Sequence, residues 1–326
     1  MSKINKIGVF TSGGDSPGMN AAIRAVVRTC AYHNIEAYGI YEGYEGLVNG
    51  NICQLGARDV SNIIQRGGTI LKSSRSETFR TKEGRQKAFE NIQKIGLDGI
   101  VAIGGDGTFT GAAIFNKEHH IPFVGIPGTI DNDLFGTDFT IGYDTAINTV
   151  VEAVDKIRDT ATSHNRLFIV EVMGKDAGFI ALRSGIAVGS EAILIPETIT
   201  YIDQLVKKLE SNRNGRESSM IVIVAEGDEL GGAYEVAKKV KEQCPQYDSR
   251  VTVLGHIQRG GNPSAMDRVL ASTMGNAAVD ALINNKTNVM VGVVNRKVTY
   301  TPFEKAIKHH DKLDMNLVNL AEILAS

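Results

Sequence analysis

The chain has 326 residues, which is more than one hydrophobic core usually supports, so two domains are expected. Its formal net charge of -2 offers no basic field to a nucleic acid, and 22% charged with 42% hydrophobic residues is typical of soluble globular proteins. No run approaches the roughly 20 apolar residues of a membrane span. Neither a nucleic acid nor a membrane is therefore expected as a partner.

The cysteines indicate a reducing environment. Cys30, Cys53 and Cys244 are far apart and odd in number, and no CxxC or Cys/His cluster favours zinc. The first residues also contain no apolar core of the kind found in a signal peptide. We therefore expect a cytoplasmic location.

The chain begins with a pattern of strand, glycine loop and helix. A strand is expected over residues 6–12, Gly13 and Gly14 make a turn, and Pro17 occupies a favoured first position of the following helix. A loop that leads into a helix N-terminus is typical of phosphate-binding sites. Neither the dinucleotide fingerprint GxGxxG nor the P-loop GxxxxGK[ST] can be fitted here.

The next segment combines short elements with glycines and cations. The expected elements are a strand, a loop and a short helix, at residues 36–42, around Tyr44 and at residues 59–65. In the stretch 66–80, Arg75 and Arg80 carry forked donors that suit a phosphate. A solvated basic loop is the alternative interpretation. An amphipathic helix then leads to the next strand.

Two stretches, residues 101–115 and 123–133, each begin as a short apolar run and end in small and acidic residues. This pattern is typical of buried parallel strands, whose carboxyl ends face the ligand in open α/β sheets. Glycines at the end of the first run let backbone amides approach a phosphate, and Thr108 is expected to open a helix that favours an anion.

The acidic residues of these stretches suggest phosphoryl transfer. Asp106 would repel a phosphate directly but suits Mg2+. Asp131 and Asp133 would share one face if their segment is extended, and either can accept a proton or hold a metal. His119 and His120 follow the helix without ligand spacing, so we expect them at the surface.

The second half of the chain alternates regularly between strands and helices. A long helix is expected over about residues 144–162, and a charged helical tail closes the chain. Strands are expected at residues 167–174, 192–197, 218–227, 250–261 and 289–295. This alternation predicts an α/β fold of two doubly wound, mostly parallel sheet domains with helices on both faces.

GGDGT and PGTIDND, joined to TSGGDSPGMNAAIR and LGHIQRGGNP, resemble the ATP-dependent 6-phosphofructokinases of the bacterial type over residues 6–293. The resemblance implies phosphorylation of fructose 6-phosphate to fructose 1,6-bisphosphate with ATP and Mg2+, the committed step of glycolysis. It also implies a homotetramer with active sites between subunits. The ATP-binding domain would be residues 1–141 plus about 257–308, and the sugar-phosphate domain residues 142–256 plus about 309–326.

The family motifs assign roles to individual residues. Asp131 matches the proton acceptor, Thr129 positions the transferring phosphoryl group, and Arg75 stabilises its charge. Asp106 matches the Mg2+ position. The positions that match ATP contacts are Gly14, Tyr44, Arg75, Ser76, Gly105, Asp106, Gly107 and Thr108.

The resemblance also implies the sugar-phosphate residues. Arg166 and Arg250 are of the type that a neighbouring subunit contributes to the 6-phosphate. Lys175, also assigned to catalysis, replaces a usual arginine and loses its planar fork, and Phe179 replaces a usual acidic residue. The matching positions are Thr129, Ile130, Asp131, Arg166, Met173, Gly174, Lys175, Glu226, Arg250, His256, Ile257, Gln258 and Arg259.

A regulatory site is left open by the sequence. The positions that match the family's effector site are Arg24, Arg28, Arg158, Gly189 and Glu191. Ala57 replaces a basic residue of that site, and the usual lysine-rich stretch reads NRNGRESS, which keeps only Arg213 and Arg216. A solvated helix face is the alternative for the two arginines of the first helix.

Other functions fit the sequence less well. Gly107 and Gly128 leave room for the α-phosphate of ATP, whereas pyrophosphate-dependent relatives carry Asp and Lys there. NAD and lipid kinases share GGDGT, but nothing in them explains PGTIDND or GHIQRGG. A catalytically silent nucleotide-sensing paralogue would be expected to lack Asp131 or Asp106, and both are present.

Overall fold

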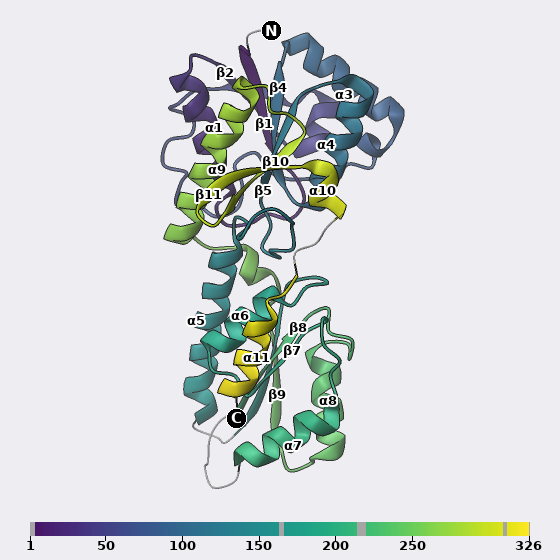
Figure 1. Ribbon diagram of the computed structural model, residues 1–326, viewed down its shortest axis with the longest axis vertical. Coiled ribbons are helices and arrows are strands. Elements are labelled where there is room, and N and C mark those ends of the chain that lie inside the picture. The colour runs from purple at the N-terminus through teal and green to yellow at the C-terminus, as the bar shows by residue number, and fades with distance from the viewer. Residues whose placement is uncertain (1–3, 163–165, 214–219, 309–311, 326) are drawn as a thin grey trace. The chain divides into compact units, whose positions relative to one another are not determined.

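The computed structural model describes residues 4–162, 166–213, 220–308 and 312–325. The chain divides into two compact units. Unit 1 consists of Met1–Ile130, Leu134–Thr145 and Arg259–Asp311, and unit 2 of Asp131–Asp133, Ala146–Gln258 and Lys312–Ser326. Each unit has one mostly parallel sheet with helices on both faces, which confirms the predicted α/β fold class (Figure 1). The functions assigned to the two predicted domains stay predictions.

Unit 1 is built on a seven-stranded sheet with the strand order β11-β10-β5-β4-β1-β2-β3. Its strands are β1 (Lys6–Thr11), β2 (Glu36–Ile40), β3 (Ile52–Leu55), β4 (Gly99–Gly104), β5 (Phe123–Pro127), β10 (Val289–Val294) and β11 (Lys297–Pro302). The five inner strands are parallel, and β3 and β11 pair antiparallel at the two edges. Gly104 pairs with Pro127, so β4 and β5 end at the same level of the sheet.

Helices cover both faces of this sheet, and each face has its own hydrophobic core (Figure 1). On one face α1 (Met19–Tyr32) and α9 (Ala265–Ile283) pack against each other. The other face carries α2 (Gly43–Asn49), the 3-10 helix η1 (Thr78–Arg80), α3 (Lys82–Ile95), α4 (Asp106–His119) and α10 (Phe303–Lys308). Because both faces are covered, β4 and β5 are buried over their whole length.

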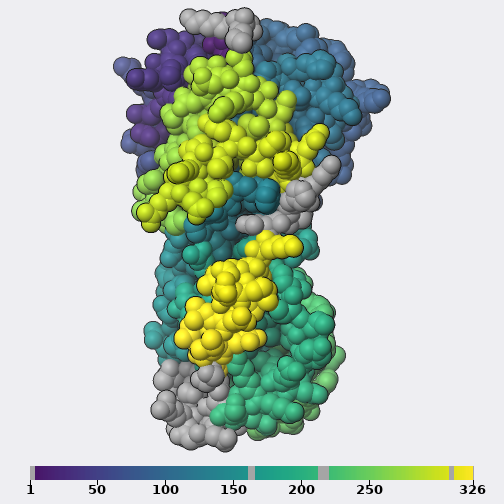
Figure 2. Space-filling model, in the orientation of Figure 1, coloured from purple at the N-terminus to yellow at the C-terminus, as the bar shows by residue number. Residues whose placement is uncertain are grey.

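Unit 2 contains a four-stranded sheet that is parallel throughout, in the order β7-β8-β6-β9. Its strands are β6 (Leu167–Val172), β7 (Ala192–Leu194), β8 (Met220–Ala225) and β9 (Ser249–Val253). The helices α7 (Ile202–Arg213) and α8 (Ala233–Gln243) form a hydrophobic core with one face of this sheet. The helix α6 (Phe179–Ala187) packs on the sheet together with α11 (Met315–Leu324). Figure 2 shows α11, in yellow, lying on the surface of unit 2. The long helix α5 (Tyr143–Thr162) begins in unit 1 and continues in unit 2.

Three local predictions were wrong. Residues 59–65 form turns instead of a short helix, and the expected loop around Tyr44 contains α2 and leads to β3. The expected helical tail begins with β11, which pairs with β10 as a hairpin. Asn295 and Arg296 both have positive φ, 49° and 64°, which is the backbone of a two-residue hairpin turn. None of the helices in the described residues is both long and apolar enough to cross a membrane.

The N-termini of α5 and α9 are joined by a reciprocal set of hydrogen bonds within unit 1. Asp267 of α9 is 1% exposed and accepts hydrogen bonds from the Gly142 amide at 2.8 Å and from the amide and hydroxyl of Thr145 at 2.8 and 2.5 Å. In return, Ser264 caps α9 and donates to Asp144 at 2.6 Å. A single carboxylate thus satisfies three donors at the start of α5.

Replacing Asp267 by alanine is expected to lower the free energy of unfolding by about 2 kcal/mol or more, because it removes a cap and leaves buried donors unsatisfied. Denaturant unfolding of the variant measures this change. Asp280→Ala, on the exposed side of the same helix, is the control and should change stability by less than about 0.5 kcal/mol. Equal stability of the two variants would contradict the proposed role of Asp267.

Candidate active site

The loops that follow β1, β4 and β5 lie at one edge of the sheet in unit 1. These strands are neighbours and parallel, so their carboxyl ends meet there. Backbone hydrogen bonds tie the loops together: the Ser12 amide donates to Ile103 at 2.9 Å, and the Gly128 amide donates to Gly104 at 3.0 Å. The structure therefore brings the three glycine-containing motifs together, as their sequence pattern predicted.

Close packing explains the glycines of the second loop. A β-carbon at Gly104 would lie 2.3 Å from Oγ1 of Thr108 and 2.5 Å from the carbonyl oxygen of Ser12. At Gly107, by contrast, an added β-carbon would meet no heavy atom within 4 Å. One glycine therefore serves packing, and the other lies next to open space.

The helix α4 begins at Asp106, two residues before the predicted start at Thr108. Its N-cap residue, Gly105, makes no side-chain capping bond, so the helix start offers backbone donors and a positive dipole end to an anion. Asp106 lies in this first turn. Magnesium is commonly held by one or two carboxylates together with phosphate oxygens and water, and this donor set fits that pattern. In the described residues, no group of three or more His, Cys, Asp or Glu side chains forms a separate metal cage.

Tyr44, predicted to contact the nucleotide, lies in the core of unit 1. Its side chain is 7% exposed, its hydroxyl donates to the Thr108 carbonyl at 2.5 Å, and its ring packs against Gly111 of α4. Burial raises the pKa of the Tyr44 hydroxyl, which remains protonated as a donor. Tyr44 therefore supports the loop from within the core.

The segment that carries Arg75 and Ser76 lies beside the glycine loop that follows β1. The Ser73 hydroxyl donates to the Gly13 carbonyl at 2.5 Å, and Ser76 donates to Glu45 at 2.5 Å. Arg75 itself is exposed, so its guanidinium is accessible to a ligand.

The motif PGTIDND follows β5 directly. The Thr129 carbonyl accepts a hydrogen bond from the Thr140 hydroxyl at 2.6 Å, Ile130 is fully buried and Asp131 is 9% exposed. Asn132 adopts a left-handed backbone with φ 54°, so the segment is not extended. The expectation that Asp131 and Asp133 share one face of an extended strand therefore does not apply.

Arg259, expected to bind the sugar phosphate, lies in unit 1 against the first glycine loop. Its guanidinium donates to the Asp15 carbonyl at 3.4 Å. A β-carbon added at Gly14 would lie 2.5 Å from its Nη1 atom, so the absence of a side chain there makes room for the arginine. Gly14 thus has a packing role that its sequence position does not reveal.

Replacing Gly14 by alanine is therefore expected to displace Arg259 and to raise the KM for the predicted sugar phosphate about tenfold, the effect of losing one charged hydrogen bond. Steady-state kinetics with each substrate varied separately measures this. Gly107→Ala, where a β-carbon meets open space, is the matched control and should leave that KM unchanged. An effect confined to the KM for ATP would contradict the role assigned to Arg259.

In unit 2 a second group of predicted residues lies at the carboxyl edge of the sheet. The Lys175 amide donates to Glu226 at 2.7 Å, and the Met173 amide donates to the fully buried Gln258 at 3.2 Å. Lys175 has a left-handed backbone with φ 57°, and its side chain is 65% exposed. Gly174 lies between these residues, and His256 and Ile257 are exposed in the 3-10 helix η2 (Gly255–Arg259). Phe179, one of the two departures from the family pattern, begins α6.

Arg166 and Arg250 lie at the other end of the same sheet. Arg166 precedes β6 and Arg250 is the second residue of β9, and both donate to Asp248, at 2.8 and 3.1 Å. Met173 follows the last residue of β6, so six strand residues separate it from Arg166. This corresponds to about 20 Å. In one chain the two groups cannot contact the same small sugar phosphate.

The residues predicted to bind an effector belong to both units. Arg24 and Arg28 lie one turn apart on α1, and burial together with the charge of Arg28 lowers the pKa of Arg24. In unit 2, Arg158 donates to the carbonyls of Val188 and Gly189, at the end of α6. Glu191 accepts a hydrogen bond from the Ile221 amide at 2.5 Å, and burial raises its pKa. Residues 214–219, which include Arg216, lie outside the described residues. A joint role in effector binding stays a prediction.

Comparisons with known proteins agree with these motifs. The family model described as phosphofructokinase matches residues 6–282. The ATP-dependent 6-phosphofructokinase of Cytophaga hutchinsonii is 57% identical over 321 residues, which is 98% of each chain. The ATP-dependent 6-phosphofructokinase 1 of Thermus thermophilus is 53% identical over 322 residues, covering 99% of this chain and all of the relative.

A solved structure of phosphofructokinase from Saccharomyces cerevisiae has a similar fold. Its TM-score is 0.89 at 39% identity, and the match covers 93% of this chain and 45% of the yeast chain. A pyrophosphate-dependent phosphofructokinase from Marinobacter aquaeolei, at 21% identity and a TM-score of 0.86, shows the fold alone.

Proposed function

Because this chain belongs to the phosphofructokinase family, we propose that it transfers the γ-phosphoryl group of ATP to the 1-hydroxyl of fructose 6-phosphate. The product is fructose 1,6-bisphosphate, and the reaction is the committed step of glycolysis. The observation that carries this proposal is the grouping of three loops, TSGGDS, GGDGT and the start of PGTIDND, at one edge of the sheet in unit 1. The three free cysteines support a reducing, cytoplasmic location.

In this proposal, unit 1 binds the nucleotide. The start of α4 and the glycine loop after β1 offer backbone donors to the phosphates, and the open space beside Gly107 accommodates the α-phosphate of ATP. Asp106 would hold Mg2+, which neutralises phosphate charge when bound. Arg75 is exposed, and its segment lies next to the glycine loop after β1. Its assigned role is to stabilise the negative charge of the transferring phosphoryl group.

The proposed chemistry requires little from the side chains beyond a proton acceptor and correct positioning. Asp131 accepts the proton of the sugar 1-hydroxyl as the oxygen–phosphorus bond forms, because the hydroxyl becomes acidic only at that stage. Thr129 positions the phosphoryl group, and Lys175 contributes positive charge. The bond between the γ-phosphorus and the bridging oxygen of ATP breaks, and ADP leaves.

The sugar phosphate supports a second proposal, that the working enzyme is an oligomer. Arg166 and Arg250 lie at the amino edge of the sheet in unit 2, whereas Met173 and His256 follow strands at its carboxyl edge. If both groups bind the same ligand, they must come from two copies of the chain. This separation supports a site completed by a neighbouring subunit, in line with the homotetramer implied by the family.

Mixing two inactive variants tests the shared site. Asp131→Asn and Arg250→Ala chains are each expected to have low activity, since one lacks the base and the other lacks a phosphate ligand. Coexpressed chains are expected to regain activity, because some sites then combine an intact base with an intact arginine from the other chain. Coexpression of Asp131→Asn with Thr129→Ala, which lie in the same half-site, is the control and should restore nothing. Equal activity of both mixtures would contradict the shared site.

Acceptor selectivity tests the proposed reaction itself. The arginines are expected to recognise the 6-phosphate. The kcat/KM for unphosphorylated fructose should therefore be lower than that for fructose 6-phosphate by a factor of at least about 100. Product formation by 31P NMR with ATP and Mg2+ measures both. Equal use of the two acceptors would contradict the assignment of the arginines.

A further inference from the structure

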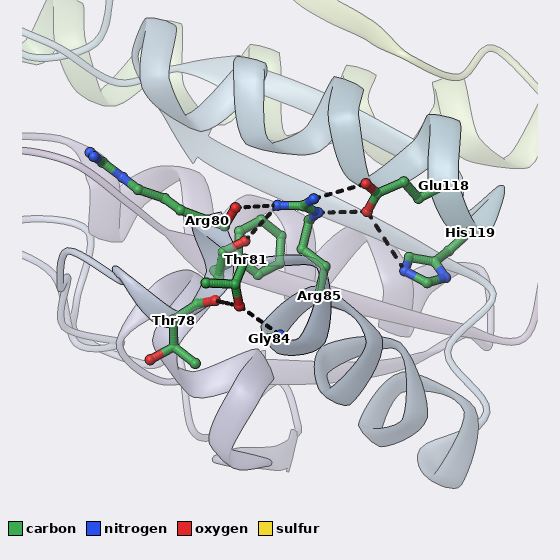
Figure 3. A network of polar contacts seen from close by, with 8 residues as sticks. Thr78, Arg80, Thr81, Gly84, Arg85, Glu118 and His119 are labelled. Carbon is green, nitrogen blue, oxygen red and sulfur yellow. Dashed lines mark hydrogen bonds and ion pairs between the residues drawn. The ribbon is translucent and has the colours of Figure 1, made fainter.

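A polar network around the buried Arg85 connects α3, α4 and η1 in unit 1 (Figure 3). Arg85 of α3 is 8% exposed, and its guanidinium faces Glu118 of α4. Two parallel bonds join them, from Nε to Oε2 at 2.5 Å and from Nη2 to Oε1 at 2.8 Å. Such a two-point contact fixes the plane of the guanidinium as well as its position.

The third nitrogen of Arg85 points to a different element. Nη1 donates to the carbonyls of Phe79 at 3.1 Å and Arg80 at 2.7 Å, both in η1. Figure 3 shows the guanidinium between the Arg80 carbonyl and Glu118. All three nitrogen atoms of the guanidinium are therefore used, and Glu118 orients the arginine so that it can hold η1.

The segment held by Arg85 is the one that carries Arg75 and Ser76. The Phe79 amide donates to the Ser76 hydroxyl at 3.0 Å, and the Phe79 ring stacks on Tyr44 with centroids 4.1 Å apart. Tyr44 in turn donates to the Thr108 carbonyl in the GGDGT loop. Arg85 thus belongs to one connected network with two groups of proposed ATP contacts, although it belongs to neither group.

The neighbouring histidine completes the packing around this network. His119 was expected at the surface, but its side chain is 13% exposed and its ring stacks on Phe89 with centroids 4.5 Å apart. Burial lowers the pKa of His119, so the neutral ring is favoured. A neutral His119 leaves the Glu118 carboxylate to Arg85.

We propose that Arg85 is a positioning residue for ATP: oriented by Glu118, it holds η1 so that Arg75 and Ser76 are fixed relative to the GGDGT loop. This inference rests on the proposed use of ATP. Loss of Arg85 frees the end of the segment, while its beginning remains attached through Ser73 and Gly13. The nucleotide then loses ordered contacts, whereas the residues assigned to sugar phosphate in unit 2 are unchanged.

A double variant separates positioning from stability. Arg85→Met with Glu118→Leu replaces the ion pair of the buried Arg85 and the partly exposed Glu118 by apolar side chains of similar size. Such a replacement of both partners leaves many proteins as stable as before. We expect a thermal midpoint close to that of the wild type, a KM for ATP about tenfold higher and a kcat about tenfold lower. The KM for fructose 6-phosphate should stay within twofold. Arg85→Lys keeps the positive charge but not the forked donors. Its KM for ATP and its kcat should lie between those of the wild type and of the double variant.

Corresponding substitutions at an exposed ion pair, Lys156→Met with Glu152→Leu, serve as the control and should change none of these values. Hydrogen–deuterium exchange provides a readout that does not need activity. Amides of residues 76–81 should exchange faster in the Arg85/Glu118 variant than in the wild type, with β4 unchanged.

The outcomes are distinguishable. A folded double variant with wild-type KM for ATP, kcat and exchange overturns the positioning role while the proposed function stands. A wild-type enzyme that is inactive with ATP overturns the proposed function, and exchange still reports on whether Arg85 holds η1. Parallel loss of ATP and sugar-phosphate affinity would also contradict the proposal, because it indicates a general structural role.

Discussion

Replacing Asp131 by asparagine is expected to lower kcat by about 100-fold or more, the usual effect of losing a general base. Asparagine has nearly the same size as aspartate but cannot accept the proton of the sugar hydroxyl. Asp131 is 9% exposed and follows a fully buried isoleucine, so a substitution of equal size preserves the packing. The KM for fructose 6-phosphate should change by less than about threefold, because the phosphate ligands are intact.

Initial rates and a thermal unfolding curve for the variant test this expectation. Asp138→Asn is the matched control, since Asp138 is exposed and its carboxylate accepts a hydrogen bond from the Asn295 amide. The control should retain nearly full turnover. A folded Asp131→Asn enzyme with turnover within tenfold of the wild type would remove Asp131 from the role of proton acceptor.

Replacing Gly107 by aspartate is expected to lower kcat/KM for ATP about 100-fold. The new carboxylate would lie in the open space beside the loop, where the α-phosphate is proposed to bind, and repulsion between these charges is worth about 3 kcal/mol in a partly exposed site. An acidic residue in the first turn of α4 is otherwise favourable to the helix. The loss would therefore not come from unfolding.

Gly107→Asn separates the effect of charge from that of size, because the asparagine side chain has nearly the shape of aspartate but carries no charge. We expect it to keep at least about a tenth of the wild-type kcat/KM for ATP, since the repulsion between charges is absent. Equal losses in the two variants would show that space decides donor use, and no loss in either would contradict the placement of the α-phosphate at Gly107.

Regular hydrophobic patterns made most of the fold predictable. The apolar runs of β4, β5 and β8 have no polar interruptions, because helices cover both faces of their sheets, and the order of the strands along the chain indicated parallel pairing. Short elements were harder to predict. Helix α2 has seven residues, two of them glycines, so it carries little helical periodicity. The hairpin of β10 and β11 depends on two residues of positive φ, Asn295 and Arg296, in a turn without glycine.

The motifs of the candidate site could be recognised in the sequence, but the packing contacts and hydrogen bonds that hold these motifs in place could not. Gly104 and Gly107 are both glycines of one loop, and only the structure shows that one packs tightly while the other faces open space. Arg85 belongs to the helix that was expected to be amphipathic, and no role was predicted for it from the sequence. Its spacing of three and seven residues from the buried Ala88 and Ile92 places it on the inner face, and this signal could have identified it.

Long-range geometry explains the remaining gap between sequence and structure. Arg166 and Arg250 are 84 positions apart in the sequence, and only the parallel pairing of β6 and β9 brings them to the same carboxylate, Asp248. The same pairing shows that they lie at the end of the sheet opposite to Met173.

The most direct test of the proposed reaction is the formation of fructose 1,6-bisphosphate from fructose 6-phosphate and Mg2+, with ATP and pyrophosphate supplied separately. We predict product with ATP and none above background with pyrophosphate, because Gly107 and Gly128 leave room for the longer donor and add no charge. Product with pyrophosphate alone would contradict the assignment of the donor. The absence of product with both would contradict the proposed reaction.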